Sequence, residues 1–140
     1  MKLPADLHPD LIERFGNGGG DLTRKMGIEF VELGAEHSVA RMPVAGNTQV
    51  VGLLHGGAYV VLGESLGSLS AAIHGGPDRI AVGIEINASH SRSVTEGWVT
   101  GTCRALSLGR TLATHEIVVT DEEGHRLSTV RITNYLKRIR

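Results

Sequence analysis

Residues 53–73 read LLHGGAYVVLGESLGSLSAAI, and the fold is built around this stretch. It is too long for a strand, and its apolar residues recur three and four positions apart, which predicts a long helix. The residues expected on its buried face are Ala58, Val61, Leu62, Ser65, Leu66, Leu69, Ala72 and Ile73. A helix with such a face needs a sheet or a second helix to cover it.

The opposite face of this helix combines small residues with one carboxylate. It carries Val60, Gly63, Glu64, Gly67, Ser68 and Ala71. An interior glycine costs about 1 kcal/mol relative to alanine, so we expect a backbone or a ligand to approach closely there. Glu64 is the only ionisable group of the helix besides His55 and His74, and Ser68 lies one turn later. This isolation predicts a functional Glu64 rather than an ordinary surface glutamate.

In much of the rest of the chain, apolar and polar residues alternate as they do in strands. Strands are expected at 26–33, 36–44, 79–90, 97–107, 110–120 and 126–136. The last four are joined by short turns, which predicts an antiparallel meander. Residues 5–15 are expected as a short helix capped by Asp6, followed by the loop GNGGGD. We predict an α+β fold in a single domain, with a helix and loop over 1–20 and the main body over 21–140.

Composition excludes several classes of function. The chain has 140 residues with a net charge of −1, which argues against a nucleic-acid binder that relies on bulk positive charge. A single cysteine, Cys103, and no apolar stretch of signal-peptide or membrane-span length predict a cytoplasmic protein with no membrane partner. The histidines show no metal-ligand spacing, so no metal site is expected.

The start of the helix is a candidate site for a carbonyl oxygen. Residues 52–57 read GLLHGG, and the unpaired N–H groups and dipole of a helix N-terminus attract an acceptor or an oxyanion. Gly56 and Glu64 are eight residues apart, roughly 12 Å along a helix. One helix therefore cannot easily bring both groups to one small reacting centre. A two-fold dimer could, by joining Glu64 of one copy to the His55-Gly56 end of the other.

Three blocks of sequence carry a family resemblance: MPVAGNTQVVGLLHGGAYVVLGESLGS (42–68), VGIEINASHSRSVTEG (82–97) and LSLGRTLATHEIVVTDEEGHRLSTVRIT (106–133). Through them the chain resembles the hotdog-fold acyl-CoA thioesterases, in the branch acting on 4-hydroxybenzoyl-CoA and 1,4-dihydroxy-2-naphthoyl-CoA. The resemblance implies a hotdog fold, with one long central helix packed on a curved antiparallel sheet and a short N-terminal helix.

The resemblance also implies roles for individual residues. Gln49 would hold the thioester end of the substrate, and the Gly56 N–H, next to His55, would polarise its carbonyl. Glu64 would act as nucleophile or general base, assisted by the hydroxyl of Ser68. In the family these groups come from both subunits of a dimer. The residues implied in CoA binding are Gly83, His90, Ser91, Arg92, Ser93, Ser107, Gly109 and Arg110.

The expected function is hydrolysis of a thioester of CoA or of a carrier protein, with no cofactor beyond the CoA of the substrate. We expect a homo-oligomer, at least a dimer, and a tetramer built as a dimer of dimers. Two alternatives stay open: a hotdog-fold hydratase or dehydratase acting on acyl thioesters, and a non-catalytic acyl-CoA-binding module. The sequence does not distinguish an aryl from an alkyl acyl group.

Overall fold

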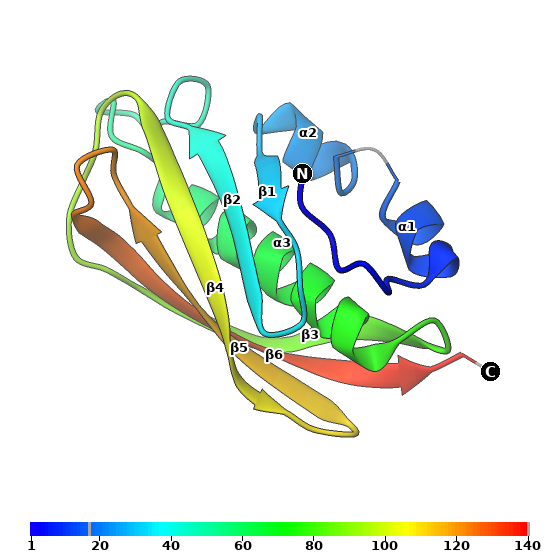
Figure 1. The fold of residues 1–140 in the computed structure, drawn as a ribbon. Helices are drawn as coiled ribbons and strands as arrows, with labels where there is room; N and C mark the ends of the chain where they lie inside the picture. Colours follow the sequence, from blue (N-terminus) through cyan, green and yellow to red (C-terminus); the bar gives the residue numbers. More distant parts are fainter. Residues whose placement is uncertain (17, 140) are drawn as a thin grey trace.

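The long helix α3, Gly56–Gly75, lies along one face of a curved six-stranded sheet (Figure 1). The computed structural model describes residues 1–16 and 18–139. Asn17 and Arg140, assigned from the sequence to the N-terminal loop and the main body, lie outside the described residues. The helix begins three residues later than predicted, because His55 caps it: its Nδ1 accepts the Gly57 N–H at 2.8 Å. It ends at Gly75 and is capped by Gly76, whose φ of 81° favours glycine.

All neighbouring strands of the sheet are antiparallel, in the order β1-β2-β4-β5-β6-β3. The strands are β1 Glu29–Glu32, β2 His37–Pro43, β3 Arg79–His90, β4 Trp98–Leu108, β5 Leu112–Thr120 and β6 Arg126–Arg138. The predicted α+β fold, with one long helix on a curved antiparallel sheet, is confirmed.

The predicted meander is wrong for one strand. The strands β4, β5 and β6 follow one another, but β3 pairs with β6 and not with β4. Both edges of β4 are paired, one with β2 and the other with β5, so β3 cannot pair with β4. As a result β3 forms one edge of the sheet, and residues 91–97 carry the chain across its end to β4.

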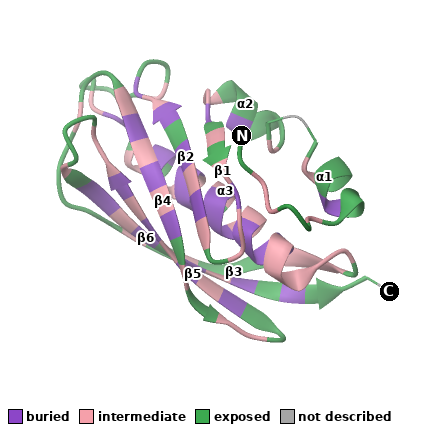
Figure 2. Ribbon diagram, viewed as in Figure 1, coloured by how far each residue is buried: buried purple, intermediate pink, exposed green. Residues whose placement is uncertain are grey.

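Nine of the 20 residues of α3 are buried, and most of the others are half-buried (Figure 2). Along this helix only Gly57 and Glu64 are exposed. The close approach expected at Gly63 and Gly67 is made by side chains of β6 and not by a ligand. A Cβ on Gly63 would lie 2.7 Å from Val130, and one on Gly67 would overlap Ile132. These two glycines instead let the helix approach β6 more closely than any larger residue would allow.

Two short helices precede the sheet, and Figure 1 shows them beside α3. The first, α1, spans Pro9–Phe15 and is capped by His8 rather than by Asp6. It starts late because proline favours the first helical position. The second, α2, Asp21–Lys25, was not predicted. Within residues 1–16 and 18–139, no helix combines the length and apolar character that crossing a membrane requires.

Candidate active site

Glu64 stands out on α3 because its side chain is exposed, whereas the other side chains of the helix are buried or half-buried. The neighbouring strand makes room for it at Gly83 of β3. A Cβ at position 83 would lie 2.8 Å from Oε2 of Glu64. The resemblance implies a role for Gly83 in CoA binding, and in the structure Gly83 lies beside the proposed catalytic carboxylate.

One turn after Glu64, the side chain of Ser68 is half buried. Its hydroxyl donates a hydrogen bond to Oδ1 of Asn134, at 3.3 Å. Within the described part of the chain, the hydroxyl makes no hydrogen bond to Glu64. Asn134 was missed at the sequence level, although a signal was present. The inward positions of β6 run Ile132, Asn134 and Leu136, so a single amide interrupts an aliphatic row.

The N-terminus of α3 forms a second group of polar atoms around Gly56. The Gly56 N–H has no hydrogen-bond partner in the residues that the structure covers. Nε2 of His90 lies 3.0 Å from where a Cβ on Gly56 would be. The ring of His90 is fixed by Ser128, whose Oγ lies 2.8 Å from Nδ1, and by Tyr59, 4.9 Å between ring centroids. Burial raises the pKa of the Tyr59 hydroxyl.

A hollow of about 380 Å³ opens beside Gly56. Its lining includes the predicted residues Gln49, Gly56, His90, Ser91, Arg92 and Ser93. Gln49 is held by its own loop, because its Oε1 accepts the Val51 N–H at 2.6 Å. His55 does not line this hollow, since its ring caps α3. The structure therefore brings together the residues expected to hold the thioester and one segment expected to hold CoA.

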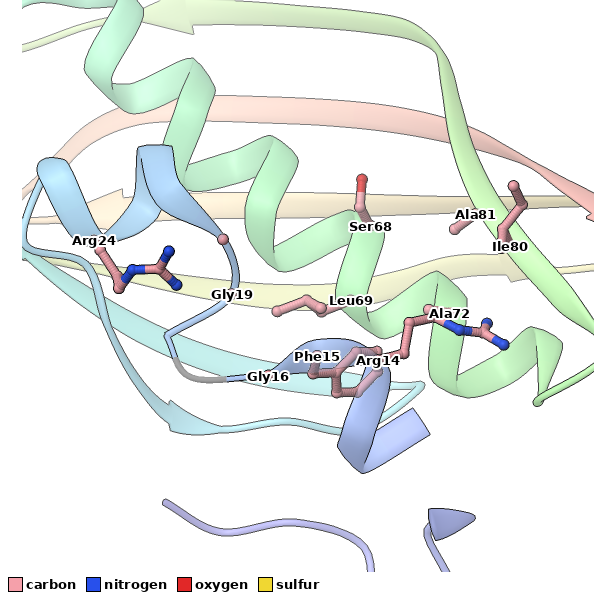
Figure 3. A pocket seen from close by; sticks show the side chains of 11 residues that line it. Arg14, Phe15, Gly16, Gly19, Arg24, Ser68, Leu69, Ala72, Ile80 and Ala81 are labelled. Carbon is pink, nitrogen blue, oxygen red and sulfur yellow. The ribbon is translucent and has the colours of Figure 1, made fainter. Parts of the chain in front are cut away.

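A second hollow, of about 440 Å³, begins at Ser68 and runs between α3 and the N-terminal helices (Figure 3). Its walls are mainly apolar and include Phe15, Leu69, Ala72, Ile80 and Ala81. Arg14 lies at its rim, and its guanidinium donates to the carbonyl oxygens of Arg79 and Pro77, at 2.7 and 2.8 Å. These two bonds tie α1 to the turn between α3 and β3. The hollow was not predicted, because its walls come from segments far apart in the sequence.

A third hollow, of about 430 Å³, gathers positive charge at the end of the sheet. Arg79, Arg110 and Arg138 line it together with Thr111, Leu136 and the aromatic ring of Tyr135. None of the three arginines forms an ion pair with a residue in the ranges 1–16 and 18–139. Arg79 donates a hydrogen bond to the carbonyl oxygen of Arg110. Only Arg110 of this cluster was predicted as a site residue.

The remaining predicted residues lie in and beside the turn between β4 and β5. Ser107 lines a separate hollow with Glu36 and Arg104. The carbonyl oxygen of Gly109 lies 2.7 Å from Nε2 of His74, near the end of α3. No group of three His, Cys, Asp or Glu side chains in the described ranges is arranged to hold a metal ion.

One chain does not bring all the candidate groups to one point. Glu64 lies beside Gly83, whereas Gly56 lies beside His90. These two positions on β3 are seven residues apart, about 23 Å at ~3.3 Å per residue. Along α3 the separation of Gly56 and Glu64 is about 12 Å. A single copy of the chain therefore holds two halves of a site at a distance from each other.

Comparison with known proteins gives concordant matches. Residues 51–128 match the model of the family described as the thioesterase superfamily. The chain is 44% identical over 115 residues to proofreading thioesterase EntH of Cronobacter turicensis, covering 81% of this chain and 84% of that protein. The fold is similar to thioesterase HI1161 of Haemophilus influenzae, with a TM-score of 0.82 and 31% identity over 91% of this chain and 87% of that one. A variant of thioesterase PA1618 of Pseudomonas aeruginosa gives a TM-score of 0.83 and 34% identity, over 96% and 95% of the two chains.

Proposed function

The chain belongs to the thioesterase superfamily, and from that premise we propose that it hydrolyses an acyl-CoA to a carboxylic acid and free CoA. Glu64 is the proposed catalytic carboxylate, acting as nucleophile or as general base on water. The observation that carries this role is its exposure: Glu64 is the only ionisable side chain exposed along α3, whose other side chains are buried or half-buried. An exposed carboxylate in that position is free to meet a substrate.

The proposed partner of the thioester carbonyl is the Gly56 N–H. This N–H lies in the first turn of α3, where the helix dipole favours a developing negative charge on oxygen. His55 supports the geometry by accepting the next N–H, that of Gly57, which fixes the start of the helix. Gln49 and His90 line the same hollow and are the proposed contacts of the thioester end.

The proposed active unit is a pair of copies, because each copy separates Gly56 from Glu64. The twelve-residue edge strand β3 supports this pairing, since its outer edge has no strand partner in the described part of the chain. In a two-fold antiparallel pairing of β3 with itself, Gly83 can face His90 of the second copy. The same register then sets His90 against Gly83 of the second copy. Each of the two sites of the dimer would then combine Glu64 of one copy with Gly56 of the other.

The arginine cluster supports CoA as the thiol carrier. Guanidinium groups bind phosphate through paired hydrogen bonds, and Arg79, Arg110 and Arg138 surround one hollow without a carboxylate partner among residues 1–16 and 18–139. The hollow at Ser68 is the proposed place of the acyl group. Its lining is mainly apolar but includes Arg14 and Arg24. With a volume of about 440 Å³, it favours a compact, largely apolar acyl group over a long chain.

The test is thiol release from aryl, short-chain and long-chain acyl-CoAs by the wild type and by Glu64→Ala. We expect the wild type to release CoA fastest from the compact acyl groups and Glu64→Ala to lose at least a hundredfold in kcat. Glu123→Ala, which removes an exposed glutamate in the turn before β6, should keep wild-type kcat. No release from any substrate would contradict the proposed function. Full activity in Glu64→Ala would contradict only the role of Glu64.

A further inference from the structure

Asn134 occupies a position where an aliphatic side chain would be expected. It lies on the inward face of β6, paired with Gly83 of β3 and Ala113 of β5, and its side chain is fully buried. Its neighbours on the same face are the buried aliphatics Ile132 and Leu136. Its Nδ2 is buried and has no hydrogen-bond partner in the residues that the structure covers. A buried amide with an unused donor costs folding free energy, so its presence calls for a function.

The oxygen of the Asn134 amide lies near the proposed catalytic residues Ser68 and Glu64. Its Oδ1 accepts the hydroxyl proton of Ser68, at 3.3 Å. The same Oδ1 lies 3.8 Å from the point where a Cβ on Gly83 would sit, and Oε2 of Glu64 lies 2.8 Å from that point. Glu64 and Asn134 therefore lie on one small space beside Gly83, and Ser68 is joined to it through Asn134.

We infer that Asn134 is a positioning residue that fixes the direction in which the Ser68 hydroxyl points. This inference rests on the proposed function, with Glu64 as general base. A water that attacks the thioester gives one proton to Glu64 and needs an acceptor for its second O–H. Ser68 Oγ can accept this O–H only when its own hydroxyl proton does not point at the water. Oδ1 of Asn134 accepts a hydrogen bond from that proton and so keeps it turned away. Without Asn134, the hydroxyl would donate to Glu64 and compete with the water.

The step balances as a hydrolysis. Glu64 removes one proton from the water while the water oxygen bonds to the carbonyl carbon, and the carbonyl electron pair moves to its oxygen. When that oxyanion collapses, the C–S bond breaks and the sulfur leaves with the electron pair. The proton held by Glu64 then passes to the sulfur. Asn134 touches neither the water nor the substrate, so its effect passes through Ser68.

The test combines Asn134→Leu, Ser68→Ala and the double variant in the thiol-release assay. Leucine is nearly isosteric with asparagine and suits the aliphatic surroundings, so the melting temperature should not fall. We expect Asn134→Leu to lower kcat about tenfold with KM within twofold of wild type. The double variant should be no slower than Ser68→Ala alone, because both changes break one chain of hydrogen bonds. Ser38→Ala, which breaks the distant buried pair of Ser38 and Ser70, should keep wild-type kcat.

Two results would overturn the inference while leaving the proposed function intact. One is a wild-type kcat in Asn134→Leu. The other is a double variant whose loss of kcat is the product of the two single losses, which would mean that Asn134 acts independently of Ser68. A wild type that releases no thiol would overturn the proposed function, and full activity in Glu64→Ala would overturn the role of Glu64. Either result would remove the basis of the inference as well.

Discussion

Glu64 of α3 and Gly83 of β3 share one space: Oε2 of the glutamate occupies the volume that a side chain at position 83 would need, 2.8 Å from its Cβ. Gly83→Ala is therefore expected to push the carboxylate aside. Because a glutamate side chain is flexible, the protein should fold normally while kcat falls at least tenfold. Steady-state kinetics and a thermal melt measure the two effects separately.

Gly75→Ala is the matched control for this substitution. A Cβ there would meet the flexible end of Leu136 at 3.3 Å, near the end of α3 and away from Glu64. It should change kcat by less than twofold. Equal activity of Gly83→Ala and wild type would contradict the assignment of this space to the carboxylate.

Gly67→Ala should affect stability instead of catalysis. Its Cβ would overlap Cγ2 of Ile132, so α3 would have to move away from β6. Overpacking of this kind costs about 1–3 kcal/mol of unfolding free energy, measurable by urea titration. Adding Ile132→Leu, which removes Cγ2, should recover part of the loss. A fully stable Gly67→Ala would mean that this helix face has room that the structure does not show.

Acid should destabilise the protein through His115. This side chain is fully buried, burial lowers its pKa, and its Nε2 bonds the carbonyl oxygen of Ala35 at 2.8 Å. Between the folded and unfolded pKa values the unfolded chain binds a proton that the folded protein does not, so unfolding takes up that proton. The free energy of unfolding should then decrease as pH falls below about 6.5. His115→Leu should flatten this decrease, and an unchanged slope in the variant would contradict it.

The arginine cluster is the proposed binding site for the phosphates of CoA. Arg110→Gln should raise KM about tenfold for acyl-CoA and leave KM unchanged for the matching acyl-pantetheine, which has no nucleotide. The effect should shrink at high salt, because exposed charges are screened. Arg126→Gln is the control, because Arg126 lies at the end of β6 opposite to Arg138 and the arginine cluster. It should leave both KM values unchanged. An equal rise in KM for both substrates would contradict a phosphate-binding role.

Periodicity in the sequence was sufficient to predict the strands and the helix, and the resemblance to hotdog thioesterases is confirmed by the family match. Strand order was harder. The place of β3 beside β6 depends on which strand edges the other strands already occupy, and no local pattern records that. The same limit applies to Gly63 and Gly67, because a helical wheel does not show how closely a helix approaches its sheet. Asn134 and Arg79 reach their partners only through the folded sheet.

The central claim is that one active site takes Gly56 from one copy and Glu64 from another. It is tested most directly by co-expressing Glu64→Gln and Gly56→Val chains that carry different tags, and purifying the mixed assembly through both. Each variant alone should be inactive in thiol release, whereas a mixed dimer keeps one complete site. The purified mixed dimer is expected to recover about half of the wild-type kcat. A mixed dimer no more active than either variant alone would contradict the shared site.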